Sequence, residues 1–279
     1  MVAMVAVAIA AGPVVADQAD PASCAVEGNE LVVSSHGDDM TLTREGDKVL
    51  VSGPEDVACE GGTRRLDRLD SIRISGGDVT TVDLRGGPLA PGATPEPDGT
   101  DEIEVRVLNS SYPGVITSHD PQRIELGTDA RGGATIDFEP VAGVAEADIG
   151  FGPDRELELE VLTGRGDDVL DARRSHVFLA LLARSGSDRI LGPETGIGKE
   201  TFSYLSAGPG DDLVDGGRGS DVIDGGRGDD VLRSHRGLDL VAPRGGSDEA
   251  DCGPGRDYFF QASPKRDDVR SCERRYIPG

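Results

Sequence analysis

The 279-residue sequence contains no tryptophan and few other aromatic residues. Six Phe and four Tyr leave little of the bulky volume that fills a thick globular core. Glycine is abundant instead, with 40 residues. This composition argues against an ordinary globule and favours a thin core of Val, Leu, Ile and Ala.

Basic residues are also scarce. The chain has 28 Lys and Arg against 52 Asp and Glu, which gives a formal net charge of −24. A nucleic-acid partner is not expected, because phosphate binding requires a cationic surface. A chain this acidic either stays disordered or neutralises its charge with cations.

Long apolar runs are confined to the first sixteen residues, MVAMVAVAIAAGPVVA. This run resembles the apolar region of a secretory signal peptide, with Val14 and Ala16 at the small-residue positions and cleavage expected before Asp17. It is short for a membrane span, and no later stretch is long enough to cross a bilayer. We therefore predict a signal peptide over residues 1–16, a secreted or cell-surface location and no membrane span.

Four cysteines fit export to an oxidising compartment. Zinc is not expected, because no CxxC motif occurs and the four histidines are scattered. Four cysteines allow three disulfide pairings. The local pairing, Cys24 with Cys59 and Cys252 with Cys272, closes two short loops and is the one we favour.

Residues 207–260 consist of one nine-residue phrase repeated six times without a gap: AGPGDDLVD, GGRGSDVID, GGRGDDVLR, SHRGLDLVA, PRGGSDEAD and CGPGRDYFF. The fourth residue is always glycine: Gly210, Gly219, Gly228, Gly237, Gly246 and Gly255. The sixth is always aspartate: Asp212, Asp221, Asp230, Asp239, Asp248 and Asp257. The eighth is apolar in every repeat. Six matches in one register indicate a repeat architecture.

Each repeat predicts a tight turn followed by a short strand. Glycine permits the backbone conformations of the turn, and residues seven to nine favour β-structure. Two turns and two strands make a flattened coil of eighteen residues. Asp212, Asp230 and Asp248 then share one edge of the stack, and Asp221 and its equivalents share the other.

Stacked coils place carboxylates of one edge about 4.8 Å apart. Two such charges repel by about 3 kcal/mol at an effective dielectric of about 20, so a column of them opposes folding. Calcium binds oxygen at about 2.3–2.6 Å, and one ion can therefore contact two successive turns. Magnesium requires a stricter octahedron and fits less well.

The repeats GGRGSDVID (216–224) and GGRGDDVLR (225–233) resemble the nonapeptide GGxGxDxUx of the RTX, or hemolysin-type, calcium-binding family. The resemblance implies a right-handed parallel β-roll with several Ca²⁺ ions in its turns. It also implies carboxylate ligands at the repeated aspartates and carbonyl ligands from the turn glycines: Gly208, Gly210, Gly216, Gly217, Gly219, Gly225, Gly226 and Gly228. The turns SHRGLD and PRGGSD lack some of these glycines, so we expect weaker sites there. Asp211 and Asp229 are expected to face solvent.

The phrase also occurs upstream, as TGRGDDVLD (163–171) and ARSGSDRIL (183–191). Asp168 precedes Asp188 by one coil plus two residues, and Asp188 precedes Asp212 by one coil plus six. We therefore expect Asp168 and Asp188 as further calcium ligands on the Asp212 edge, with the run 177–182 as a strand on the opposite side.

Residues 24–150 contain short β-type runs separated by Gly, Asp or Pro: LVV, KVLV, SIRI, TTVDL, EIEVRVL, RIEL, ATIDF and, just beyond, ELELEVL. Almost nothing is typical of a long amphipathic helix. We predict an all-β fold in which a parallel β-helix continues into the calcium-binding roll; a separate β-sandwich over 24–150 is the alternative. The Pro- and Gly-rich segment 86–101 is expected to protrude.

The predicted organisation is a signal peptide (1–16), a β-helix-like region (17–150), the roll (151–260) and a disulfide-bonded cap (261–279). The N-terminal half and the tail also resemble secreted bacterial calcium-binding repeat proteins, which have a Cys pair ahead of their nonapeptides. HExxH and GxSxG are absent, so we predict a secreted, non-catalytic protein whose roll folds on binding Ca²⁺. The alternatives are an enzyme acting on acidic polysaccharide along the β-helix face, such as a lyase or epimerase, and an adhesin that binds a cell-surface glycan or protein through 86–101.

Overall fold

The computed structural model describes residues 23–35, 39–53, 59–60, 65–76, 79–85, 103–108, 110, 112–117, 123–128, 133–138, 149–151, 158–194, 202–260 and 267–276. The proposed signal peptide, the 86–101 segment, His119 and most of the 192–200 insert lie outside these ranges. Within these ranges, strands account for nearly all regular structure, with one 3₁₀ turn, η1 (Leu66–Arg68). Among the described residues, no helix has the length and apolarity needed to cross a lipid bilayer.

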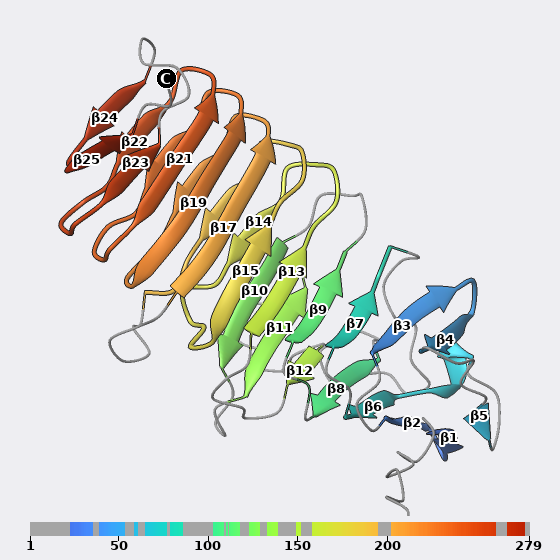
Figure 1. The fold of residues 1–279 in the computed structure, drawn as a ribbon. Helices are drawn as coiled ribbons and strands as arrows, with labels where there is room; N and C mark the ends of the chain where they lie inside the picture. The colour runs from blue at the N-terminus through green and yellow to red at the C-terminus, as the bar shows by residue number, and fades with distance from the viewer. Residues whose placement is uncertain are drawn as a thin grey trace, which may run out of the picture.

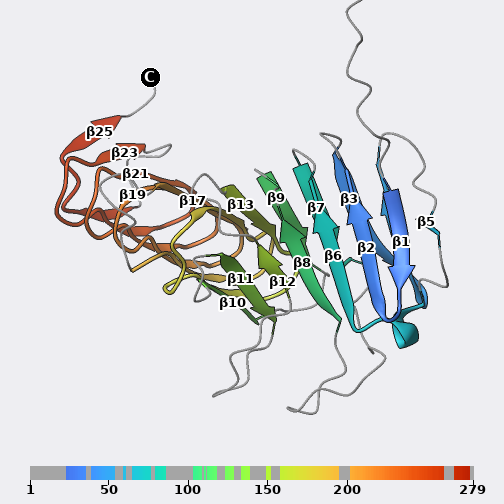
Figure 2. The same ribbon diagram turned by 90° about the horizontal axis from the view of Figure 1, so that it is seen from below.

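The strands form two long sheets that run from the N-terminal to the C-terminal end of the described chain (Figures 1 and 2). Sheet A has 14 strands in the order β24 (Asp268–Arg270), β22 (Glu249–Asp251), β20 (Val231–Arg233), β18 (Leu213–Asp215), β16 (Arg189–Leu191), β14 (Val169–Asp171), β10 (Arg123–Thr128), β11 (Ala134–Phe138), β12 (Ile149–Phe151), β8 (Glu104–Leu108), β6 (Ser71–Ser75), β2 (Glu30–Ser34), β1 (Ser23–Glu27) and β5 (Cys59–Glu60). Sheet B has 11 strands in the order β25 (Arg274–Tyr276), β23 (Tyr258–Phe260), β21 (Leu240–Gly245), β19 (Ser220–Arg227), β17 (Phe202–Pro209), β15 (Phe178–Leu182), β13 (Glu158–Leu162), β9 (Tyr112–Ile116), β7 (Val79–Asp83), β3 (Met40–Glu45) and β4 (Lys48–Ser52).

From β13 onward the chain alternates between the sheets, and every pairing is parallel. In the roll, Leu213 pairs with Val231 and Val222 with Leu240, which is the eighteen-residue coil that two nonapeptides predict. Upstream, the paired aspartates Asp168, Asp188 and Asp212 are 20 and 24 residues apart. The run 177–182 supplies β15 in sheet B, opposite the strands that follow these aspartates.

The N-terminal part departs from a regular helix of coils. Each of its predicted β-runs overlaps a strand, but β1–β2 and β3–β4 are antiparallel hairpins that close the end of the stack. Strands β10, β11 and β12 form an antiparallel excursion within sheet A before the chain returns to parallel coils. Both sheets nevertheless continue into the roll, since β9 pairs with β13 and β10 with β14. The predicted all-β, parallel β-helix and β-roll class is thus confirmed, and a separate sandwich is not what the strands form.

The core is thin and is built from two facing apolar columns. The sheet A column contains Ile190, Val214, Leu232 and Ala250; the sheet B column contains Leu205, Ile223, Val241 and Phe259, and all eight are at most 1 % exposed. From Val214 onward these are the eighth residues of the repeats. Burying each Val, Leu, Ile or Phe contributes about 1.5–3 kcal/mol, and no single coil buries enough to fold alone.

Disulfide-bonded cysteines lie at both ends of the stack. Cys252 and Cys272 form a disulfide that spans the last coils, with a Cα–Cα distance of 5.1 Å. Cys24 is also disulfide-bonded, and the backbone register pairs it with Cys59. The side chain of Cys59 lies outside the described part of the chain.

Candidate calcium-binding turns

Eight buried aspartates form two columns along the edges of the stack. One column contains Asp168, Asp188, Asp212, Asp230 and Asp248, and the other contains Asp221, Asp239 and Asp257. All eight side chains are at most 3 % exposed. The structure therefore brings together every aspartate that the repeat predicted, in the predicted division between edges.

Within each column, one carboxylate oxygen links successive coils. Oδ1 of Asp230 accepts a hydrogen bond from the backbone N–H of Asp212 at 3.0 Å, and the N–H of Asp230 donates to Oδ1 of Asp248 at 3.0 Å. The same bond joins Asp221 to Asp239 at 2.9 Å and Asp239 to Asp257 at 3.0 Å. The upstream bonds of the longer coils, at Asp168 and Asp188, are both 2.7 Å.

The second carboxylate oxygen has no partner. Oδ2 of all eight column aspartates is buried and forms no hydrogen bond with the described residues. A buried acceptor without a partner destabilises the fold by about 1–3 kcal/mol, and more if it is charged. Eight equivalent orphaned oxygens therefore indicate that the turns are built to hold cations.

Burial raises the pKa of seven of the eight column carboxyls, and the negative charges of nearby carboxylates raise it further. The pKa rises to about 8 for Asp221, about 7 for Asp188 and Asp230, and about 6 for Asp212 and Asp239; Asp248 and Asp257 are shifted in the same direction. Without a cation, the folded columns thus favour the protonated form of these carboxyls.

The turn glycines form a cradle that a side chain would fill. A Cβ on Gly216 would lie 2.7 Å from Oδ2 of Asp221, and one on Gly225 would lie 2.6 Å from Oδ2 of Asp230. The orphaned oxygen thus lies against the first glycine of its own turn. At the fourth position, a Cβ on Gly228 would lie 1.8 Å from the carbonyl oxygen of Gly210 in the adjacent coil. Carbonyl oxygens therefore face the next turn at close range, where a cation shared by two coils needs them.

The two turns that lack glycine at the second position keep the same backbone shape. His235 and Arg244 adopt φ of +65° and +74°, like the glycines at equivalent positions. Each also contacts an aspartate of the preceding coil: His235 Nε2 lies 2.7 Å from Asp215, and Arg244 pairs with Asp224 at 2.6 Å. The weaker binding expected of these turns remains a prediction.

Aspartates at the fifth position form an outer ladder that the sequence interpretation missed. Asp211 and Asp229 are exposed as expected, yet Oδ1 of Asp211 accepts from the N–H of Asp229 and Oδ1 of Asp229 accepts from the N–H of Ser247, both at 2.8 Å. The recurrence of Asp or Ser at the fifth position was the signal for this ladder.

The second column has a defined start that the sequence interpretation also missed. One coil before Asp221 the register places Ser203, and one coil before that Leu179. Ser203 hydrogen-bonds the carboxylate of Asp221 and lowers its pKa, against the larger effect of burial. Counting eighteen residues back from Asp221 would have found this serine. Carboxylates thus line this edge only from Asp221 onward.

Each turn offers few charged ligands. Among the described residues, no three His, Cys, Asp or Glu side chains converge on one point. A cation in these turns must therefore take most of its ligands from backbone carbonyl oxygens, with one carboxylate from each turn. Calcium, which accepts six to eight oxygen ligands in flexible geometry, matches such a donor set.

These features are those of a β-roll with two rows of candidate cation-binding turns. Comparison with known proteins agrees: the family model for the RTX calcium-binding nonapeptide repeat matches residues 204–241 in 4 copies. This segment is an RTX repeat segment, and RTX repeats bind several Ca²⁺ ions, so the predicted family and cofactor are confirmed. Searches of the curated proteins and of the solved structures gave no significant match.

Close stacking of the turns makes a specific prediction at Gly228. Its φ of +127° disfavours a side chain, and an added Cβ would meet backbone atoms rather than a movable side chain. We expect Gly228→Ala to destabilise the roll by more than about 3 kcal/mol, measured by urea unfolding in saturating calcium. Gly150→Ala is the matched control, because nothing lies within 4 Å of an added Cβ there. Equal stability of the two variants would contradict the stacking geometry.

Proposed function

We propose that this protein is a secreted, non-catalytic calcium-binding protein whose C-terminal roll folds when Ca²⁺ occupies its turns. The observation that carries the proposal is the set of eight buried aspartates, each with one carboxylate oxygen left without a partner. A cation explains this pattern better than a neutral ligand does, because each of these buried carboxyls becomes an anion when it loses its proton and then needs a positive charge beside it.

The proposed ligands are the Oδ2 atoms of the column aspartates and the carbonyl oxygens of the turn glycines. The second edge contributes Asp221, Asp239 and Asp257, and the first contributes Asp212, Asp230 and Asp248. Asp168 and Asp188 have the same burial and the same orphaned oxygen, so we extend the array to them although they precede the segment that the family model matches. When bound, calcium neutralises the columns and joins successive turns. The chain itself supplies the stacking hydrogen bonds and the apolar columns.

Secretion is supported by the redox state of the cysteines and by the character of the sites. The Cys252–Cys272 disulfide is typical of proteins outside the cytosol. Sites made mainly of neutral carbonyl oxygens suit the weak affinities, about 10⁻⁴–10⁻³ M, of extracellular calcium modules. At millimolar extracellular calcium such sites fill, and the binding free energy adds to the stability of the roll.

Calorimetric calcium titration of the full chain tests the proposal. We expect saturable binding of several ions, accompanied by a gain of β-structure in the far-ultraviolet circular dichroism spectrum. Asp168→Asn with Asp188→Asn should lower the number of bound ions, whereas Asp167→Asn, an exposed neighbour, should not. Absence of binding heat at millimolar calcium would refute the proposal, and an unchanged ion number in the double variant would refute its upstream extension.

A further inference from the structure

Four of the ten Phe and Tyr residues of this aromatic-poor chain line one groove on the outer face of sheet B. The groove encloses about 380 Å³ and crosses β7, β9, β13, β15 and β17. Tyr112 and Phe202 are about half exposed, at 53 % and 48 %. Such a concentration of exposed rings marks a binding surface rather than a core.

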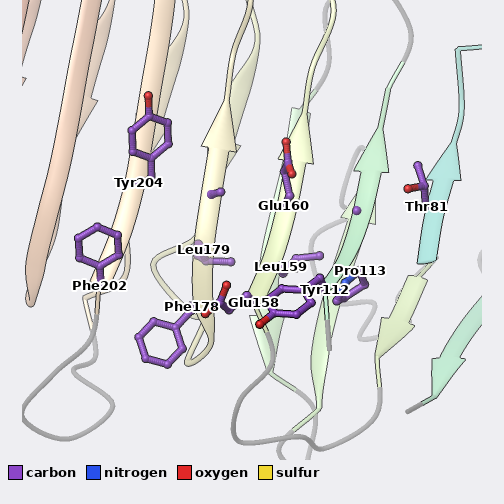
Figure 3. A pocket seen from close by; sticks show the side chains of 12 residues that line it. Thr81, Tyr112, Pro113, Glu158, Leu159, Glu160, Phe178, Leu179, Phe202 and Tyr204 are labelled. Atoms are coloured by element: carbon purple, nitrogen blue, oxygen red, sulfur yellow. The ribbon is translucent and has the colours of Figure 1, made fainter. Parts of the chain in front are cut away.

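The side chains form two rows along the stack (Figure 3). In the strand register, Tyr112, Glu158, Phe178 and Phe202 fall in one row, and Glu160 and Tyr204 fall in the row beside it. Successive members lie on coils about 4.8 Å apart. Two carboxylates thus stand among four aromatic rings in a regular, straight array.

The charge of the groove selects its ligand. Glu158 and Glu160 are exposed and form no ion pair with any residue that the structure describes, and neither Lys nor Arg lines the groove. An acidic polysaccharide would meet uncompensated repulsion here, which argues against the alginate or pectate class. A cation is attracted both by the two carboxylates and by the faces of the rings.

The backbone excludes an added peptide strand. Strands β9, β13 and β15 each pair with a strand on both sides, so their N–H and C=O groups are already used. Ligands on this face can contact side chains only. A sugar ring meets this condition, because its flat C–H face packs on an aromatic ring while its edge carries polar groups toward a carboxylate. One sugar unit is also about as long as one coil spacing.

We propose that this face binds a linear glycan of amino sugars, with the rings of Phe202 and Phe178 under adjacent sugar units and the ring of Tyr112 two coils beyond Phe178. Glu158, between Phe178 and Tyr112, and Glu160 would bind protonated amines. This site goes beyond calcium binding and uses none of the calcium ligands. The roll supplies only the rigid spacing of its first coils.

The test is isothermal titration of the calcium-saturated full chain, at mildly acidic pH, with a hexamer of β-1,4-linked glucosamine. The N-acetylated hexamer has the same backbone without the charge, and hexagalacturonate has the opposite charge. We expect the glucosamine hexamer to bind at least about tenfold more tightly than the acetylated one, and hexagalacturonate not to bind.

Two double variants measure the contributions of the aromatic rings and of the carboxylates to binding separately. Phe178→Ala with Phe202→Ala should weaken binding at least about tenfold. Glu158→Gln with Glu160→Gln keeps the shape and should remove the preference for the amine form. Leu238→Ala, an exposed apolar residue elsewhere, and Glu45→Gln, an exposed acid on the N-terminal hairpin, are the controls.

Several results would overturn the proposal. These are no binding of the glucosamine hexamer, an affinity for it that is the same in the wild type and in both double variants, or tighter binding of a lysine-rich peptide than of the hexamer. A wild-type dimer that Phe178→Ala with Phe202→Ala converts to a monomer would assign the groove to a second copy of the chain instead. Circular dichroism and calcium titration of each variant distinguish loss of the groove from loss of the roll. If the alanine variant does not fold, the shape-preserving glutamine variant decides the outcome.

Discussion

We expect chelation of calcium at a slightly alkaline pH to unfold the roll over residues 207–260, and acidification without calcium to fold it again. Both effects follow from the column aspartates. When these carboxyls ionise in the absence of a cation, buried like charges face one another at the spacing of the coils. When they are protonated, the same side chains keep their Oδ1 hydrogen bonds and lose the charge.

The pH window follows from the shifted pKa values. Five of these carboxyls, those of Asp188, Asp212, Asp221, Asp230 and Asp239, have folded-state pKa values of about 6 to about 8, above the ordinary 3.8. Because the folded state holds the protons more tightly, their stabilising contribution is complete below the ordinary pKa and is lost as the pH rises through about 6 to 8. The carboxyls of Asp83 and Asp171 have lowered pKa values beside Arg85 and Arg173, and strong acid removes that contribution. The calcium-free protein as a whole should therefore be most stable at about pH 4–5.

Far-ultraviolet circular dichroism with chelator across the pH range measures the transition, and hydrogen exchange locates it. We expect the N-terminal strands, which contain none of the eight column aspartates, to stay protected while 207–260 exchanges. Calcium should abolish the pH dependence, and magnesium should restore the roll less completely. A spectrum that chelator leaves unchanged at alkaline pH would show that the columns are stable without cations.

Asp230→Asn separates the two roles of a column aspartate. Asparagine keeps an oxygen that can accept the hydrogen bond from the N–H of Asp212, but it removes the charge and replaces the orphaned oxygen. In chelator at alkaline pH we expect the variant to be more stable than the wild type, because a repelling charge is gone. In calcium we expect the affinity of the adjoining sites to fall by about tenfold or more, so the order of stabilities reverses.

Two further variants calibrate this result. Asp230→Ala also removes the acceptor for Asp212 and should be less stable than Asp230→Asn by about 1–3 kcal/mol in both conditions. Asp229→Asn makes the same chemical change one residue away, on the exposed outer ladder, and should alter calcium affinity little. Thermal melts with chelator and with calcium provide the measurement. A stability order that is the same in both would contradict a calcium-ligand role for Asp230.

The roll was predictable because its constraints are local and repeated. The glycine at the fourth position, the aspartate at the sixth and the apolar residue at the eighth recur every nine residues. To predict the stack, it was then enough to assume that two repeats form one coil. The same reasoning found Asp168 and Asp188, whose longer coils preserve the edge on which they lie. It missed Ser203 because this position holds a serine instead of the repeated aspartate, although the strand register places Ser203 in line with Asp221.

The sequence alone determined the class of fold, the two aspartate columns, the glycine turns and the metal, because each depends on residue types at a fixed short period. Tertiary structure decided the rest. The hairpins at the N-terminal end and the β10–β12 excursion follow no period, so only pairing with neighbouring strands sets their place. The aromatic row joins Tyr112, Glu158, Phe178 and Phe202 from coils of unequal length. Such residues align only after hydrogen bonding has fixed the register of every strand between them.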